Sequence, residues 1–137
     1  MIRERQFETA KILTTPPAYI RVHIDGFGAR PDGKGSGFAW IQEGTRKQHV
    51  GYHDGLTTIE AEYLALQSAL EALPVDSSAE VFTKSMLVCW QFNGKYRVRD
   101  FRISQLLGGI KEVIAKNQLT VKVNWMDRQK NLAGKLN

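Results

Sequence analysis

The stretch that sets the fold is YIRVHIDG, residues 19–26, in which β-branched and aromatic residues alternate with polar ones. This alternation predicts a β-strand over 19–24 that ends at Asp25-Gly26, a common turn pair. The glycine-rich residues 26–37 then predict a hairpin connection to a second strand at 38–42, and a third strand is expected at 47–52. The fold is therefore expected to begin with an antiparallel meander.

The residues on either side of the meander complete the expected organisation. Residues 1–18 are polar and contain Pro16-Pro17, which block both helix and ladder, so we interpret 1–18 as an N-terminal arm and 19–137 as one domain. An apolar face with spacings of four and three predicts a helix that starts at Thr57 or Thr58 and stops at Pro74. The face consists of Ile59, Tyr63, Leu66, Leu70 and Leu73.

Further along, the pattern predicts a strand at 80–83, helices at 85–93 and 101–116, a strand at 120–125 and a final helix from residue 130. Gly108-Gly109 weakens the middle of the second of these helices. Three consecutive strands followed by alternating helices and strands indicate an α/β fold with a five-stranded mixed sheet, three strands antiparallel and two parallel, flanked by helices.

Charge is distributed unevenly along the 137 residues. The net charge is +5, yet residues 1–83 hold 8 Lys/Arg against 11 Asp/Glu, and residues 84–137 hold 11 Lys/Arg against 3 Asp/Glu. This asymmetry favours a polyanionic partner for the second half, although a solvated basic surface gives the same count. The single cysteine, Cys89, excludes an internal disulfide. No apolar run is long enough to span a membrane, so we expect a cytoplasmic protein without membrane contact.

Two acidic residues stand where the pattern makes a carboxylate informative. Asp25 lies at the expected end of the first strand, where it is either a turn residue or a group facing the mouth of the sheet. Glu62 lies three residues after Ile59 and four before Leu66, beside the buried face of the helix. A charged group there requires a partner, so Glu62 is either a functional residue or one half of a salt bridge to a basic neighbour.

Four segments occur in a fixed order: VHIDG (22–26), TTIEAEYLAL (57–66), SMLV with QFNGKYRV (85–88 and 91–98), and WMDRQKN (125–131). Together they resemble the ribonuclease H family, particularly its bacterial and archaeal type 1 branch. The resemblance spans residues 19–137 and implies a ribonuclease H-like fold. It also implies a site in which four carboxylates hold two Mg²⁺ ions that cleave the RNA strand of an RNA–DNA hybrid.

The resemblance assigns the first two carboxylates of that site to Asp25 and Glu62. The third position, in an Asp-Ser pair of the family, is Lys84 here, and the fourth, four residues after Asn131, is Lys135. Two acidic and two basic groups neutralise each other without metal, so we predict that the lysines take the place of the ions and that Asp25 and Glu62 bind Mg²⁺ weakly or not at all. Alternatively, Lys135 is mobile near the C-terminus and only Lys84 reaches the carboxylates.

Basic residues of the second half are the candidates for contact with nucleic acid: Lys95, Tyr96, Arg97, Arg99, Arg102 and Arg128. Tyr96 is the best candidate for stacking on a base because basic residues flank it. We expect Trp40, Trp90 and Trp125 to pack in or near the core instead.

Three hypotheses for function follow. The first is a ribonuclease H-like domain that binds an RNA–DNA hybrid or related duplex, or a protein partner, with cleavage lost or strongly reduced. The second is an active hybrid-cleaving ribonuclease H that uses one Mg²⁺ and a lysine in place of the second ion. The third is a structural or dimerising domain without ligand. The sequence leaves the oligomeric state open.

Overall fold

The computed structural model of the protein describes residues 18–28 and 35–136. The arm expected over residues 1–18 lies outside this part of the chain except for its last residue. Five strands form one mixed sheet in the order β3-β2-β1-β4-β5. They are β1 (Ile20–Phe27), β2 (Gly37–Gln42), β3 (Gln48–Tyr52), β4 (Ser78–Thr83) and β5 (Thr120–Trp125). β1, β2 and β3 are antiparallel neighbours, and β1, β4 and β5 are parallel neighbours. The predicted fold class is therefore confirmed.

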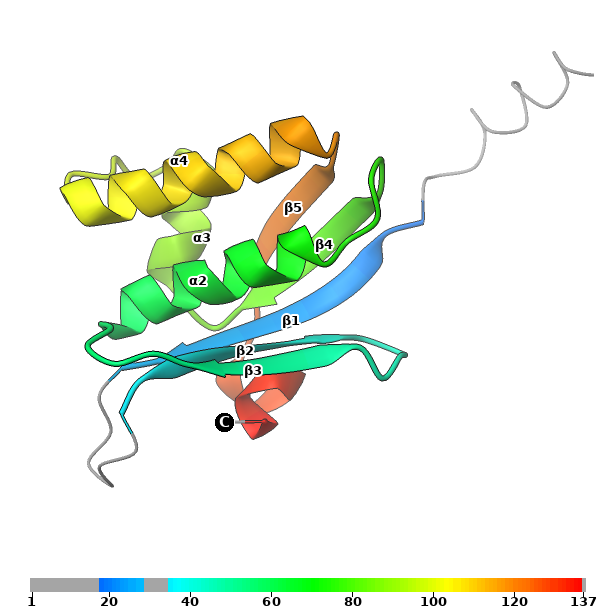
Figure 1. The fold of residues 1–137 in the computed structure, drawn as a ribbon, viewed down its shortest axis with the longest axis horizontal. Coiled ribbons are helices and arrows are strands. Elements are labelled where there is room, and N and C mark those ends of the chain that lie inside the picture. Colours follow the sequence, from blue (N-terminus) through cyan, green and yellow to red (C-terminus); the bar gives the residue numbers. More distant parts are fainter. Residues whose placement is uncertain (1–17, 29–34, 137) are drawn as a thin grey trace, which may run out of the picture.

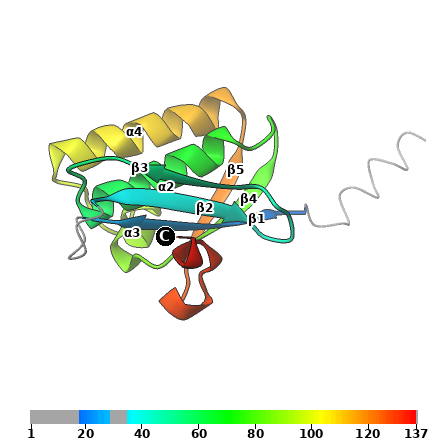
Figure 2. The same cartoon turned by 60° about the horizontal axis from the view of Figure 1, so that its bottom comes forward.

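Three α-helices cover one face of this sheet, and the second of two short 3-10 helices that follow β5 lies against the other face (Figure 1 and Figure 2). The α-helices are α2 (Thr58–Glu71), α3 (Met86–Phe92) and α4 (Phe101–Lys116), and the 3-10 helices are η1 (Arg128–Lys130) and η2 (Leu132–Lys135). The core lies between the sheet and the α-helices. Its fully buried side chains include Val22, Ile24, Tyr63, Leu66, Leu70, Val81, Ile110 and Val123.

Helix α2 begins where its sequence provides a complete capping box. The Thr57 hydroxyl accepts a hydrogen bond from the Glu60 backbone N–H, and the Glu60 carboxylate accepts one from the Thr57 N–H. These two bonds satisfy backbone donors that the first turn of a helix leaves free. They also hold α2 in the position from which Glu62, one turn further along, reaches the sheet.

The C-terminal segment differs from its prediction, because no α-helix starts at residue 130. Asn131 interrupts the helical conformation there: its backbone is extended between η1 and η2, and its side chain is buried. The Asn131 amide donates to the Ile24 and Phe82 carbonyls, and its oxygen accepts from the Ala133 N–H. These contacts with two strands replace the hydrogen bonds that would continue a helix.

Gly108 offers a simple test of the expectation that glycine weakens α4. The residue is exposed in the middle of the helix, and a Cβ atom added there would meet nothing within 4 Å. Gly108→Ala should therefore raise the free energy of unfolding by about 0.5–1 kcal/mol, measured by urea denaturation. Gly26→Ala is the matched opposite, because its Cβ would lie 2.2 Å from the Glu62 backbone nitrogen and should destabilise the protein. A loss of stability in Gly108→Ala would contradict the packing described for α4.

Candidate functional site

Asp25 lies within β1 rather than at its end. The strand continues to Phe27, and Asp25 is paired with Ala39 of β2. Its side chain is largely buried, on the face of the sheet that η2 covers, where Gly134 approaches the Asp25 carboxylate. The turn predicted at Asp25-Gly26 is therefore wrong, because pairing with β2 extends the strand by three residues.

Glu62 reaches the same place from α2. The close approach of helix and strand depends on Gly26, since any side chain at this position would collide with the α2 backbone. The Gly26 N–H donates a 2.6 Å hydrogen bond to Glu62 Oε1, and the Thr83 hydroxyl at the end of β4 donates to Glu62 Oε2. Glu62 is completely buried. The helix, β1 and β4 thus meet at one carboxylate.

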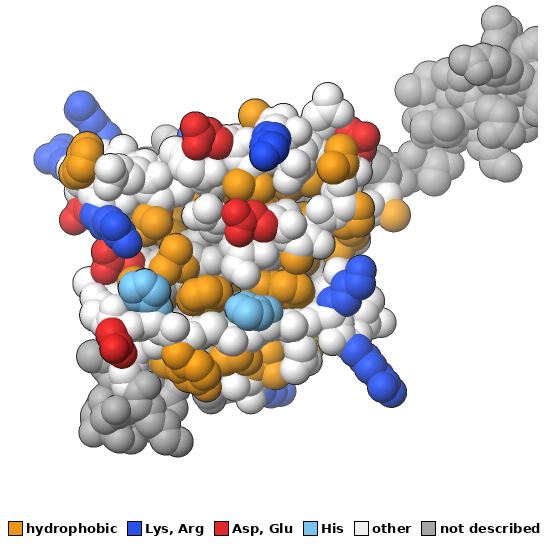
Figure 3. Space-filling view, viewed as in Figure 1, with side chains coloured by type: hydrophobic (Ala, Val, Ile, Leu, Met, Phe, Trp, Pro, Cys, Tyr) orange, Lys and Arg blue, Asp and Glu red, His pale blue; other side chains and the backbone are white. Residues whose placement is uncertain are grey.

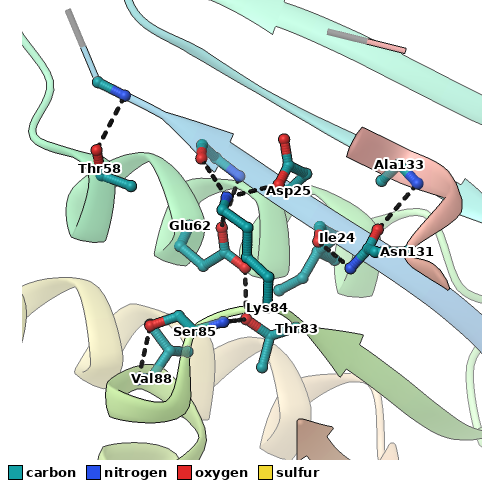
Figure 4. A network of polar contacts seen from close by, with 12 residues as sticks. Ile24, Asp25, Thr58, Glu62, Thr83, Lys84, Ser85, Val88, Asn131 and Ala133 are labelled. Atoms are coloured by element: carbon teal, nitrogen blue, oxygen red, sulfur yellow. Dashed lines mark hydrogen bonds and ion pairs between the residues drawn. The ribbon is translucent and has the colours of Figure 1, made fainter. Parts of the chain in front are cut away.

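The ammonium group of Lys84 lies between the two acidic residues (Figure 4). Lys84 directly follows β4, and its Nζ donates to Asp25 Oδ1 at 2.5 Å, to the Gly26 carbonyl at 2.5 Å and to Glu62 Oε1 at 3.2 Å. A lysine ammonium has three N–H donors, so all three have acceptors from the protein. The structure therefore brings Asp25, Glu62 and Lys84 together in one ion-pair cluster.

Burial and charge act in opposite directions on Glu62. Burial raises the pKa of Glu62 above its ordinary value because it disfavours the charged carboxylate. The positive charge of Lys84 and the Thr83 hydrogen bond lower the pKa, and the negative charge of Asp25 raises it again. The balance is a raised pKa, so the charge of Lys84 only partly compensates for the burial of this carboxylate.

Lys135 does not join this cluster. Its side chain is exposed at the end of η2, and within residues 18–28 and 35–136 it forms no ion pair with Asp25 or Glu62. The neighbouring Gly134 nevertheless lies beside Asp25, because Asn131 holds the segment against β1. Of the two lysines predicted at the site, the structure places one among the carboxylates and the other at its rim.

The residues present do not suit a pair of Mg²⁺ ions. Magnesium requires oxygen ligands in octahedral geometry, whereas here the space between the Asp25 and Glu62 oxygens is taken by a positively charged nitrogen. Among the described residues, no group of three or more His, Cys, Asp or Glu side chains is arranged to hold a metal ion. The cluster is consistent with the salt-bridge interpretation of Glu62, in which Lys84 is the basic neighbour.

The candidate nucleic-acid residues lie mainly in the loop between α3 and α4. Lys95, Tyr96, Arg97 and Arg99 are exposed there, and the Trp90 and Tyr96 rings meet edge to face at 5.2 Å. At the start of α4, Arg102 is exposed and its Nε lies 3.2 Å from Glu60 Oε2.

Arg128 is exposed in η1, beyond β5. The basic residues of the loop therefore lie close together on one exposed segment, and Arg128 belongs to another segment.

Two of the three tryptophans differ from the prediction. Trp40 is buried and donates to the Ser68 hydroxyl, but Trp90 and Trp125 are exposed. Trp90 lies on a seven-residue helix that buries only Val88 and Cys89. Trp125 ends an edge strand, where its indole N–H donates to the Lys84 carbonyl. Both side chains are therefore more exposed than the packing in or near the core that we expected.

Sequence reasoning passed over three residues that shape the site. Thr83 and Gly26 both donate to Glu62, and Asn131 places the C-terminal segment beside Asp25. Thr83 and Gly26 adjoin the motif residues Lys84 and Asp25, and Asn131 ends the last motif. Their position in the motifs was the available signal, but their hydrogen-bond partners are 21 to 107 residues away in the chain.

Several solved structures resemble this fold and site. LC11-RNase H1, isolated from compost by a metagenomic approach and solved in complex with an RNA/DNA hybrid, matches with a TM-score of 0.77 and 28% identity over 85% of this chain and 92% of that chain. RNase H1 of the halophilic archaeon Halobacterium salinarum NRC-1 matches with a TM-score of 0.72 and 21% identity over 87% of this chain and 93% of that chain. The N-terminal RNase H domain of rv2228c from Mycobacterium tuberculosis was solved as a fusion with maltose-binding protein. It matches with a TM-score of 0.71 and 21% identity over 85% of this chain and 90% of that chain.

No protein-family model matches the chain, and no curated protein matches it. The similarities define an α/β protein with a ribonuclease H-like fold. The resemblance to the type 1 ribonucleases H that the sequence motifs indicated is thereby confirmed.

Proposed function

We propose that this protein is a ribonuclease H-like domain that binds nucleic acid and has lost two-metal cleavage of RNA–DNA hybrids. The observation that carries the proposal is the position of Lys84 Nζ, which donates to both remaining carboxylates of the site. The motif resemblance assigns Lys84 to the position of the family's third carboxylate, and the lysine carries a positive charge, as a metal ion would.

The charges of the cluster oppose metal binding. A Mg²⁺ ion held by Asp25 and Glu62 would lie next to the Lys84 ammonium, and a divalent and a monovalent cation at about 4 Å repel each other by about 8 kcal/mol at an effective dielectric constant of 20. The ion would also have to displace the hydrogen bonds that Lys84 makes to Asp25 and to the Gly26 carbonyl. Both effects support loss of the metal site.

The alternative, in which Lys84 replaces one ion during catalysis, has less support. A lysine that stabilises a phosphate needs at least one N–H directed to the substrate. The three acceptors of Lys84 are all protein atoms, and its side chain is only 20% exposed. The Lys84 ammonium therefore donates its hydrogen bonds to protein acceptors rather than to a bound phosphodiester.

Binding of nucleic acid is supported by charge and by similarity. Residues 84–137 carry the excess of basic residues, and the exposed loop between α3 and α4 presents Lys95, Arg97 and Arg99 together with Tyr96. The similar LC11-RNase H1 was solved in complex with an RNA/DNA hybrid. A hybrid or related duplex is therefore the partner we propose.

None of the described helices is long and apolar enough to cross a membrane. A cytoplasmic location stays a prediction.

The proposal is tested with the native chain and a labelled RNA–DNA hybrid. We expect fluorescence anisotropy to report binding that weakens steeply between about 50 mM and about 200 mM salt. No cleavage is expected with Mg²⁺ or Mn²⁺ at long times and high protein concentration. Binding that is absent, or independent of salt, would contradict the nucleic-acid part of the proposal, and metal-dependent cleavage would contradict the loss of activity.

The double variant Arg97→Ala with Arg99→Ala should weaken hybrid binding and reduce its salt dependence. The slope of log affinity against log salt should fall by about 1 for each arginine that contacts a phosphate. Lys111→Ala with Lys116→Ala is the matched control, because it also removes two positive charges, from exposed positions in the C-terminal half of α4, away from this loop. Equal losses in the variant and the control would show that the net charge, and not the α3–α4 loop, determines binding.

A further inference from the structure

Strand β3 forms one edge of the sheet, and its outer side is unpaired among the described residues. Edge strands are usually protected by charged residues, proline or a bulge, because free backbone groups can pair with another chain. The five residues of β3 are Gln48, His49, Val50, Gly51 and Tyr52, and none is Lys, Arg, Asp, Glu or Pro. Tyr52 is 68% exposed. This edge therefore has none of the usual protection within the strand.

The backbone groups of β3 that face outward follow from its pairing with β2. The Gln42 N–H donates to the Lys47 carbonyl, and the His53 N–H donates to the Ser36 carbonyl. Because the backbone groups of successive residues in a strand point to opposite sides, residues 47, 49, 51 and 53 face β2. The N–H and C=O groups of Gln48, Val50 and Tyr52 therefore point away from the sheet.

Opposite charges flank the two ends of this edge. Arg46 and Lys47 precede β3, and Asp54 follows it. All three are exposed, and none forms an ion pair with another described residue. In the face shown in Figure 3, basic side chains lie at one end of the lower part of the molecule and an acidic side chain at the other, with hydrophobic and histidine side chains between them. The edge thus has a positive and a negative end.

We propose that two copies of this chain associate through antiparallel pairing of their β3 edges, about a twofold axis at Val50. This register joins Val50 to Val50 of the second copy, and Gln48 to Tyr52 in both directions. It uses every outward backbone group of the strand, because each directly opposed pair exchanges two hydrogen bonds. A shift of two residues in either direction would leave some of these groups unpaired.

The same register matches the charges. It places Arg46 opposite Asp54 of the second copy twice, as a twofold interface requires. Parallel pairing would instead bring the two positive ends together. The proposed contact also covers part of Tyr52 with Gln48 of the second copy, and Val50 with its own counterpart.

This interface is independent of the proposed function. β3 and β5 are opposite edges of the sheet, and α3 contacts the β5 side. Association through β3 would therefore leave the loop between α3 and α4 accessible in both copies.

Sedimentation equilibrium over increasing concentrations of the native chain tests the proposal. We expect a reversible monomer–dimer equilibrium. Val50→Pro removes an outward N–H without touching the ladder to β2, and should raise the dimer dissociation constant at least about tenfold. Val50→Thr keeps the N–H and should leave the constant within about threefold of the native value. Circular dichroism and thermal melting show whether each variant is folded.

Charge variants test the register. Arg46→Asp alone and Asp54→Arg alone should each weaken the dimer by about three- to tenfold, because like charges then face each other. An equimolar mixture of these two variants should form a heterodimer, since every contact between them is again between opposite charges. Hydrogen exchange of the native chain should show the amides of Gln48, Val50 and Tyr52 becoming protected as concentration rises.

A native chain that stays monomeric up to about 1 mM, near the weak end of measurable affinities, would overturn the proposal. A dimer that Val50→Pro and both charge variants leave unchanged would overturn it as well, because association would then use another surface. If the three amides become protected only after an unrelated extended peptide is added, the edge binds a strand of another chain, and the proposed pairing of two copies is overturned.

Discussion

Replacement of Lys84 by methionine is expected to lower the free energy of unfolding by about 3–5 kcal/mol near neutral pH, since it removes one partner from a buried ion-pair cluster. Methionine approximates the length and apolar part of lysine but carries no charge. Asp25 and Glu62 would then lose the positive charge that lies between them, and the Gly26 carbonyl would lose a donor. Urea denaturation of the native chain and the variant measures the difference.

Lys135→Met is the matched control for this prediction. It makes the same chemical change at the other lysine that the family motif assigns to the site. Lys135 is exposed and contacts neither carboxylate in the described structure, so its replacement should change stability by no more than about 0.5 kcal/mol. Similar effects of the two replacements would contradict the arrangement in which Lys84, and not Lys135, lies between the two carboxylates.

The effect of Lys84→Met should depend on pH. Burial holds the pKa of Glu62 above its ordinary, unfolded value, so the folded chain keeps a proton that the unfolded chain releases between the two pKa values. The stability from this proton is present below the unfolded pKa and is lost as the pH rises through the folded pKa.

Lys84 lowers the pKa of Glu62, so its removal should raise this pKa further and extend the loss to higher pH. The gap in stability between native chain and variant should therefore be smaller at about pH 5 than at about pH 8. A gap that is constant over this range would show that Glu62 is not the group left uncompensated.

The double variant Lys84→Asp with Lys135→Asp should acquire Mg²⁺-dependent cleavage of the RNA strand in an RNA–DNA hybrid. Aspartate at position 84 would remove the cation between Asp25 and Glu62 and add a third carboxylate beside them. Aspartate at position 135 would add a fourth next to Gly134, which already lies against Asp25. We expect a rate at least about 10³-fold above that of the native chain, because two metal ions stabilise both the attacking and the leaving oxygen.

The single variants separate the contributions of the two lysines. Lys135→Asp alone should remain inactive, because Lys84 still lies between the carboxylates. Addition of Glu62→Gln to the double variant should abolish cleavage, since it removes the carboxylate on which α2, β1 and β4 converge. Thermal melting adds a readout that needs no activity: Mg²⁺ should raise the melting temperature of the double variant and leave that of the native chain unchanged.

Either outcome of the cleavage assay is informative about the native chain. A silent native chain beside an active double variant would identify the scaffold as a nuclease that lysine inactivated. Cleavage by the native chain itself, dependent on Mg²⁺ and lost in Glu62→Gln, would instead make Lys84 part of the chemistry.

The fold could be predicted from the sequence because its signals are local. The alternation of residues 19–24, the apolar face from Ile59 to Leu73 and the strand at 120–125 each specify an element through neighbours a few residues away. The element boundaries that were predicted wrongly depend on contacts with distant segments. β1 extends to Phe27 because β2 pairs with it, and Asn131 prevents a C-terminal helix because two strands accept its hydrogen bonds.

The sequence by itself determined the order of strands and helices, the capping of α2 and the two lysines at positions where the motif resemblance implies acidic residues. Only the tertiary structure decided that Lys84, 59 residues from Asp25, lies between the carboxylates while Lys135 remains outside. It also decided that Trp90 and Trp125 are exposed and that Glu60 forms an ion pair with Arg102. The physical reason is that burial and ion pairing depend on which elements pack together, and the residue pattern of one segment does not specify which other segments pack against it.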